Sequence, residues 1–157
     1  MGYWMSNITL EQLTDVMIDK IKQGGEVYLN PTGSSMWPTI WHKRDRVVLK
    51  QCDTVQKYGI YLFRRTDGSI VLHRCVRVMR NSFWFRGDHQ KKSRTEKNIL
   101  QDQIIARVAV LYRKNRVFRC TSFFCCISYY ILPLYKALFA LYNFWRKLCE
   151  KGNQNAK

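Results

Sequence analysis

The sequence predicts a mainly β protein: a small coiled antiparallel β-sheet or barrel-like domain, with an N-terminal helix and a C-terminal apolar helical segment. Short runs rich in β-branched and aromatic residues, at 45–50, 60–64 and 69–78, are separated by turns, including the hairpin signal Asp67-Gly68. Residues 103–112 form a long run that is apolar on both faces, typical of a strand closing a small barrel or sandwich. Helical spacing occurs near the two ends.

These patterns divide the chain into an N-terminal helix (1–25), a β domain (26–116) and a C-terminal aromatic helical segment (117–157). The helix is predicted from a capping box at Thr9-Leu10-Glu11-Gln12, followed by an apolar face, and it should end near Gly24-Gly25. We expect this helix to pack on the β domain; presenting its face to a partner is the alternative. Residues 91–98 are polar and are expected to form a mobile insertion.

Composition and charge limit the classes of function. Aromatic residues at 14% and apolar residues at 46% exclude a disordered chain. The formal net charge of +16 indicates an anionic partner, either nucleic acid or phospholipid, unless it serves only solubility. Nucleic acid is the less favoured partner because no zinc-finger spacing, RNA-recognition signature or basic recognition helix is present. Aromatic residues that could stack on bases must also fill the core: Tyr61, Phe63, Trp84 and Phe85.

The six cysteines indicate the compartment rather than a site. They have neither the spacing of metal ligands nor that of a disulfide framework, and residues 1–7 do not resemble a secretory signal. We therefore expect a reducing, cytoplasmic setting and neither metal nor cofactor.

The C-terminal segment predicts contact with a membrane. A basic stretch at 113–119 precedes sixteen uncharged residues, 120–135, and Pro133 and Lys136 interrupt the apolar run. Three arrangements are open: an interfacial helix pair, a broken transmembrane anchor, or a helix covering the apolar face of the barrel. Aromatic residues and flanking bases favour an anionic membrane surface, at the inner face of the membrane.

Three polar residues in separate segments suggest hydrolytic chemistry. Ser35 lies in the turn-rich run 31–40, His73 lies in the strand 69–78, and Asp88 follows the short aromatic strand 83–86. A serine is a weak nucleophile without a neighbouring base, and histidine is the base best suited to neutral pH. Each residue alone is more simply a turn serine, a strand histidine or a turn aspartate, but their joint order favours a site.

The ordered motifs G-x-S-M-x-P-T at 33–39, V-x-H-R at 71–74 and G-D at 87–88 resemble those of the LexA and signal peptidase I superfamily of serine peptidases. The resemblance covers residues 27–112 and is closest to the branch with a histidine base. It implies a coiled antiparallel sheet, Ser35 as nucleophile, His73 as general base and Asp88 as the group that orients the base. It also implies a peptide substrate bound along a strand edge.

The surroundings of Ser35 suggest further roles. Its backbone N–H would bind the oxyanion, but Gly33 stands where many bacterial members carry a second hydroxyl donor. Thr32 and Ser34 are candidate replacements, with Arg74 as a supporting residue. Substrate binding is expected at three residues beside the nucleophile: Met36, Trp37 and Pro38.

The predicted function is a serine endopeptidase that cleaves a leader or precursor peptide. Signal peptidases usually carry an N-terminal anchor, and the sequence shows none, which favours substrates inside the cell. Autoproteolytic repression is disfavoured because such proteins use a lysine base and cut an Ala-Gly bond, a dipeptide missing here. A catalytically silent β module that binds peptide, membrane or nucleic acid remains the alternative.

Overall fold

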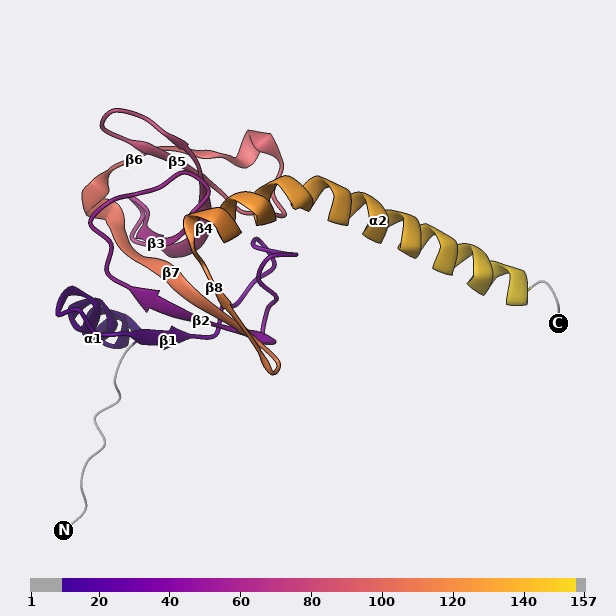
Figure 1. The fold of residues 1–157 in the computed structure, drawn as a ribbon, viewed down its shortest axis with the longest axis horizontal. Coiled ribbons are helices and arrows are strands. Elements are labelled where there is room, and N and C mark those ends of the chain that lie inside the picture. Colours follow the sequence, from indigo (N-terminus) through magenta and orange to yellow (C-terminus); the bar gives the residue numbers. More distant parts are fainter. Residues whose placement is uncertain (1–9, 155–157) are drawn as a thin grey trace, which may run out of the picture.

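The structure is a computed structural model that describes residues 10–154, with side chains for residues 14–147 (Figure 1). Helix α1 spans Leu10–Lys22, and the capping residue predicted at Thr9 lies outside the described residues. Strands and short helices then follow in order: β1 (Val27–Leu29), β2 (Asp45–Lys50), β3 (Ile60–Arg64), β4 (Ile70–Val78), β5 (Phe83–Arg86), η1 (Lys92–Arg94), β6 (Glu96–Ile99), η2 (Gln101–Gln103), β7 (Ile104–Arg113) and β8 (Arg116–Arg119). The long helix α2, Ser122–Gln154, ends the described chain.

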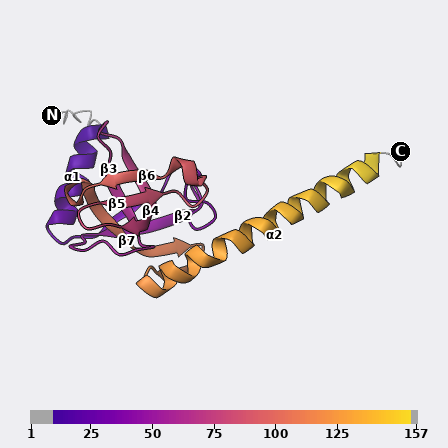
Figure 2. The same ribbon diagram turned by 90° about the horizontal axis from the view of Figure 1, so that it is seen from above.

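The strands form one antiparallel sheet in the order β1-β2-β7-β3-β4-β5-β6, and β8 pairs with β7. The mainly β fold with a helix at each end is therefore confirmed. The sheet curls without closing, so β7 does not complete a barrel but lies between β2 and β3 (Figures 1 and 2). β8 extends the sheet to Arg119, past the boundary predicted at residue 116.

The β3–β4 hairpin sets which residues of β4 share a face. Its turn is held by Asp67, whose Oδ1 accepts hydrogen bonds from the N–H of Ser69 at 2.9 Å and from its hydroxyl at 2.6 Å. The register pairs His73 with Tyr61. Because successive residues of a strand point to opposite faces, His73 and its neighbour Arg74 lie on opposite faces of the sheet.

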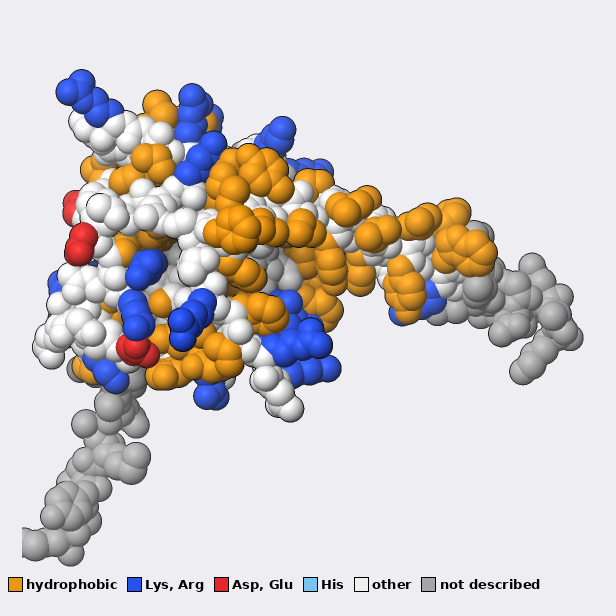
Figure 3. Space-filling view, in the orientation of Figure 1, with side chains coloured by type: hydrophobic (Ala, Val, Ile, Leu, Met, Phe, Trp, Pro, Cys, Tyr) orange, Lys and Arg blue, Asp and Glu red, His pale blue; other side chains and the backbone are white. Residues whose placement is uncertain are grey.

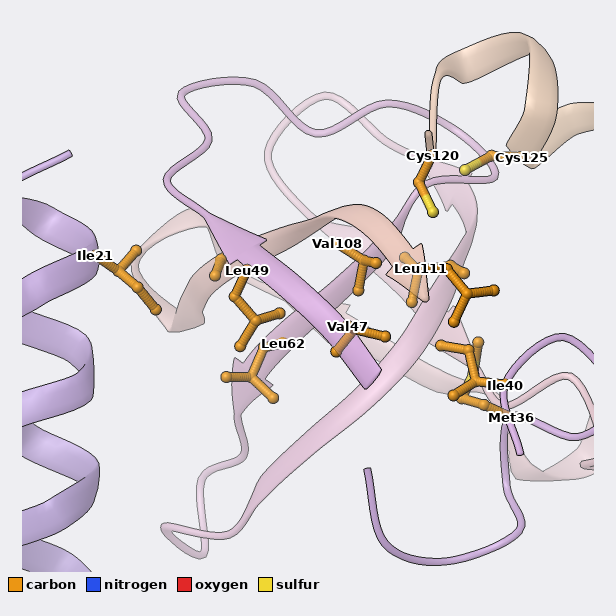
Figure 4. Close-up of a cluster of buried hydrophobic side chains, with 12 residues drawn as sticks. Ile21, Met36, Ile40, Val47, Leu49, Leu62, Val108, Leu111, Cys120 and Cys125 are labelled. Carbon is orange, nitrogen blue, oxygen red and sulfur yellow. The ribbon is translucent and has the colours of Figure 1, made fainter. Parts of the chain in front are cut away.

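Each face of the sheet carries a hydrophobic cluster. The larger cluster joins distant segments, because Ile21 of α1, Met36 of the turn after β1 and Cys125 of α2 all point into it (Figure 4). Ile21 is fully buried, so α1 packs on the sheet. The smaller cluster, on the face of His73, consists of Tyr61, Phe63, Cys75, Phe85 and Ile99.

Helix α2 is continuous through Pro133, so of the three arrangements left open for the C-terminal segment, the helix pair and the broken anchor do not fit the structure. The structure holds the helix on both sides of the proline: Leu132 is buried, and Lys136 Nζ donates a hydrogen bond to the carbonyl of Asp88. These contacts fix the backbone on either side of the residue that lacks an N–H. The C-terminal part of the helix projects away from the sheet (Figures 1 and 2).

Candidate active site

Ser35 lies in a turn that the core holds in place. The flanking Met36 and Ile40 are buried, and the N–H of Ile40 donates to the carbonyl of Met36 at 2.9 Å. Gly33 has φ +88°, a left-handed conformation that a glycine adopts without strain. Ser35 itself is half-buried. The turn therefore presents Ser35 at the surface of the larger hydrophobic cluster.

Asp45 holds the far end of this loop. The buried carboxylate accepts hydrogen bonds from the backbone N–H of Trp41 at 2.9 Å and from Arg113 Nη2 at 2.8 Å. Burial alone would raise the pKa of Asp45, but the hydrogen bonds from Arg44 and Arg113 outweigh it and lower the pKa. Arg113 Nη2 also donates to the carbonyl of Thr39 at 2.6 Å, so one guanidinium ties the loop to β7.

The turn of Ser35 lies directly against the segment that follows β5. The carbonyl of Ser35 accepts a hydrogen bond from the N–H of His89 at 2.8 Å. A Cβ atom on Gly87 would lie 2.6 Å from that carbonyl oxygen and 3.0 Å from the Cβ of Ser35, so only glycine permits this approach. Gly87 follows Arg86, the last residue of β5, which pairs with Arg74.

Ser35 and His73 line the same groove. The groove has a volume of about 1170 Å³ and runs between α1, β1, the Ser35 turn and the adjoining parts of β3 and β4. Its walls include Thr32, Met36 and Leu72. Both residues thus border one large groove, but the His73 ring packs beside Phe63 on the face of the smaller cluster, whereas the Ser35 turn lies at the larger one. No hydrogen bond joins the Ser35 hydroxyl to His73 in the part of the chain that the structure describes.

The imidazole of His73 is buried, with 2% of the residue exposed, and its Nδ1 lies 2.8 Å from Oε1 of Glu96. The in-plane direction of the ring N–H is poorly aligned with that oxygen, so Nδ1 has a close carboxylate but no well-formed hydrogen bond. Burial lowers the pKa of His73, and the negative charge of Glu96 opposes that effect. The ring is therefore held in its neutral form, as a general base requires.

Glu96 is held by Arg65 through two parallel hydrogen bonds, from Nε to Oε2 at 2.6 Å and from Nη2 to Oε1 at 2.7 Å. Burial would raise the pKa of Glu96, but Arg65 and His73 together lower it, so the carboxylate stays charged. Glu96 begins β6, opposite Phe85 of β5. The prediction of a mobile insertion at 91–98 is wrong, because this segment contains η1 and β6.

The role predicted for Asp88 must be corrected. Its carboxylate is bound by Arg74, with Nε to Oδ1 at 2.7 Å and Nη2 to Oδ2 at 2.7 Å, on the face of β4 opposite to His73. Glu96, which sequence reasoning missed, is the carboxylate at the His73 ring. A signal existed, since Glu96 is the one acidic residue between Asp88 and Asp102 in a basic run.

Arg74 is also not a candidate oxyanion donor. Besides its two bonds to Asp88, its Nη1 donates to the carbonyls of Tyr58 at 2.9 Å and Cys125 at 3.0 Å, and its Nη2 donates to Thr39 Oγ1 at 3.1 Å. A guanidinium has five N–H groups, and all five have an acceptor here. Arg74 is fully buried and joins the sheet to the Ser35 loop and to the start of α2.

The remaining predicted residues divide between two sides of the turn. Thr32 and Met36 line the groove, whereas Ser34 is exposed and its carbonyl accepts the N–H of Trp37 at 3.1 Å. Trp37 and Pro38 were predicted to bind substrate, but they face α2. The indole ring of Trp37 packs on Phe139 with ring centroids 4.9 Å apart. Pro38 lines a separate apolar pocket of about 280 Å³ beneath α2.

The described residues contain no group of three His, Cys, Asp or Glu side chains arranged to hold a metal ion. The sequence matches no protein-family model and no curated protein.

Proposed function

We propose that the protein is a serine endopeptidase of the signal peptidase-like type, with Ser35 as nucleophile and His73 as general base. The observation that carries the proposal is that Ser35 and His73, from separate segments, line one groove while the Glu96 carboxylate lies 2.8 Å from Nδ1 of His73. The motif resemblance described above points to the same two residues. Glu96 replaces Asp88 as the third member.

The proposed reaction uses only groups of this chain. Neutral His73 accepts the hydroxyl proton as Ser35 Oγ attacks the scissile carbonyl carbon, and it then donates that proton to the leaving amine. Water, deprotonated by the same ring, releases the acyl group in the second half. Glu96 stabilises the imidazolium formed in each half. The Ser35 N–H makes no hydrogen bond within the described part of the chain, so it is available to the oxyanion, and the Thr32 hydroxyl is the candidate second donor.

The groove supports an extended peptide as substrate. Edge strand β1 forms one wall, so a peptide can add main-chain hydrogen bonds while its side chains contact Met36, Ile40 and Leu72. We infer that the substrate is a leader or precursor peptide in the cytoplasm, processed at the inner face of the membrane. One apolar helix long enough to associate with a membrane, α2, supports this location.

A serine-directed acylating probe and a panel of leader peptides test the proposal on the purified full chain. Labelling and cleavage should be lost in Ser35→Ala and cleavage should fall at least about 10³-fold in His73→Ala, as for other catalytic serine–histidine pairs. Ser34→Ala is the matched control, because it removes the neighbouring exposed hydroxyl and should retain both properties.

The missing hydrogen bond between Ser35 and His73 favours one other function, the silent peptide-binding module. In that case the wild-type chain would bind peptides in the groove without labelling or cleavage, and Ser35→Ala would bind them equally well. That result, or cleavage that survives in Ser35→Ala, would exclude the peptidase.

A further inference from the structure

Helix α2 has one side that belongs to the domain. Cys125 and Leu132 are buried against the sheet, and the ring of Tyr129 stacks on Tyr58 with centroids 4.5 Å apart. Lys136 donates its hydrogen bond to the Asp88 carbonyl from the same side. The first half of α2, up to residue 136, is therefore a docked helix with a fixed rotation about its axis.

The opposite side of α2 carries an exposed apolar stripe, whose docked half is bordered by contacts with the domain: the Tyr130 hydroxyl bonds that of Tyr58 at 3.0 Å, and Ile127 and Ile131 line the rim of the apolar pocket beneath the helix. At about 100° per residue, nine large side chains fall within an arc of about 120°, centred opposite the docked side. Their exposed fractions range from 40% at Ile127 to 75% at Phe123. The stripe consists of Phe123, Ile127, Tyr130, Ile131, Leu134, Leu138, Leu141, Tyr142 and Trp145.

The stripe continues without a change of direction from the docked half into the projecting half. In the projecting half, the side of α2 that is in line with the docked residues is polar and carries Asn143 and Lys147. The projecting half is therefore amphipathic, with its apolar side in line with the stripe of the docked half. A buried core helix would be apolar all round, whereas this pattern fits a helix lying between water and an apolar phase.

Length decides between a helix that spans a bilayer and one that lies on it. By composition Ser122–Lys147 could cross a membrane, but its first half is packed on the sheet. The part without a ring contact to the domain, residues 140–147, is about 12 Å long at about 1.5 Å per residue, well short of a hydrocarbon core about 30 Å thick. Extension to Gln154 gives about 22 Å and adds charged Glu150 and Lys151.

We propose that α2 lies in the plane of an anionic phospholipid surface, with its stripe in the acyl boundary and the β domain on the water side. The idea deepens the membrane location given under the proposed function, and it does not depend on peptidase chemistry. Tyr130, Tyr142 and Trp145 are suited to the headgroup level. The net charge of +16 complements anionic lipid, and Figure 3 shows Lys and Arg side chains on both sides of the place where α2 leaves the domain.

This orientation determines where the candidate active site lies relative to the lipid surface. The indole of Trp37, two residues after Ser35, contacts the rings of Tyr135 and Phe139 on the flank of α2. The Ser35 turn therefore lies beside α2, next to the lipid surface. A peptide can therefore enter the groove from water while the protein stays bound to the lipid surface.

Sedimentation of the full chain with vesicles tests the proposal. Vesicles of phosphatidylcholine mixed with phosphatidylglycerol should bind the protein more tightly than phosphatidylcholine alone, and added salt should weaken binding. Leu138→Glu, in the stripe, should weaken binding at least tenfold, or about 1.4 kcal/mol. Asn143→Glu adds the same charge to the polar side of the same helix and should change binding less than threefold.

Two further measurements separate the competing outcomes. Alkaline carbonate should release the protein from membranes of expressing cells if the helix lies in plane; retention in the pellet would show a spanning helix and overturn the proposal. Failure to bind vesicles, with a dimer in solution that Leu138→Glu dissociates, would assign the stripe to a second copy instead. Ser35→Ala should bind vesicles like the wild type, so loss of peptidase activity and loss of lipid binding are read independently.

Discussion

His73 and Arg74 are neighbours on β4, and both are almost completely buried. They lie on opposite faces of the sheet and differ in how completely their N–H groups are hydrogen-bonded. Arg74 has an acceptor for each of its five N–H groups, including a bidentate pair with Asp88. His73 has Glu96 at 2.8 Å but no well-aligned hydrogen bond at Nδ1. Arg74, with all its N–H groups bonded, holds three segments together. His73, with an incompletely bonded ring, can still exchange a proton.

The difference follows from the cost of burying charge. A buried guanidinium is tolerated only with partners that replace its hydration, and its pKa stays high because Asp88 offsets the effect of burial. An imidazole can instead lose its proton, and burial lowers the pKa of His73 accordingly. Strong, complete bonding therefore indicates a structural role for Arg74, while a titratable ring with incomplete bonding is consistent with the general base proposed at His73.

Removing the Arg74 side chain should have the largest effect on stability. Arg74→Met should lower the free energy of unfolding by about 3–5 kcal/mol, because it leaves the Asp88 carboxylate buried without a partner. Guanidinium unfolding measures the loss. The control is Arg64→Met, since Arg64 forms only an exposed ion pair with Asp15 at 3.6 Å and should cost less than about 1 kcal/mol.

A double variant sharpens this test. Arg74→Met with Asp88→Leu removes both charges, so it should regain part of the stability that Arg74→Met loses. If the double variant is no more stable than the single one, the loss comes from the bonds to Tyr58, Thr39 and Cys125 rather than from the unpaired carboxylate.

Glu96 tests the other half of the comparison. Glu96→Gln should reduce peptide hydrolysis about 10²-fold, or about 2.7 kcal/mol, because the imidazolium of His73 loses its counter-charge. It should also move the acid limb of the pH–rate profile to lower pH, since the charge of Glu96 raises the pKa of His73. A purely structural residue would not move that limb.

Asp102→Asn provides the control, because Asp102 is the next acidic residue along the chain and is exposed. It should leave both the rate and the acid limb unchanged. Full activity in Glu96→Gln, together with a loss in an Asp88→Asn variant that remains folded, would restore the assignment made from sequence.

Local patterns in the sequence predicted much of the fold. Alternation along 45–50 and 60–78, with the turn at Asp67-Gly68, located β2, β3 and β4, because a strand with one face in the core repeats every two residues. Closure of the sheet could not be inferred, since it depends on how far the whole sheet coils. The continuity of α2 through Pro133 was missed for a similar reason: contacts of Leu132 and Lys136 with the domain override the local preference of proline.

The candidate site was predicted as far as motifs extend. Ser35 and His73 were predicted from the ordered motifs; both line one groove, and their joint role stays a prediction. The carboxylate assignment failed because Asp88 lies in the turn after β5 and Glu96 at the start of β6, and the direction of neither side chain can be read from a charged, loop-like sequence. Arg74 shows the same limit: only its coordinates reveal that Tyr58, Thr39, Cys125 and Asp88 converge on it.

The smallest expected effect, and the most direct measure of the contrast between the two neighbours, is a pH dependence of stability. The unfolded His73 ring has the ordinary pKa of about 6.5, and burial lowers the pKa in the folded state. As pH falls below about 6.5, the unfolded chain therefore takes up a proton first, and stability declines until the lowered folded pKa is passed. Above about pH 6.5 the ring is neutral in both states and contributes no slope.

His73→Gln should flatten that decline when guanidinium unfolding is measured from neutral pH down to about pH 5. The window is separate from that of Asp45 and Glu96, whose lowered pKa values add stability that is present above about pH 4 and lost only in stronger acid. An identical slope in wild type and His73→Gln would mean that the folded ring protonates as freely as the unfolded one. In that case the buried imidazole would not be held neutral, and its contrast with Arg74 would disappear.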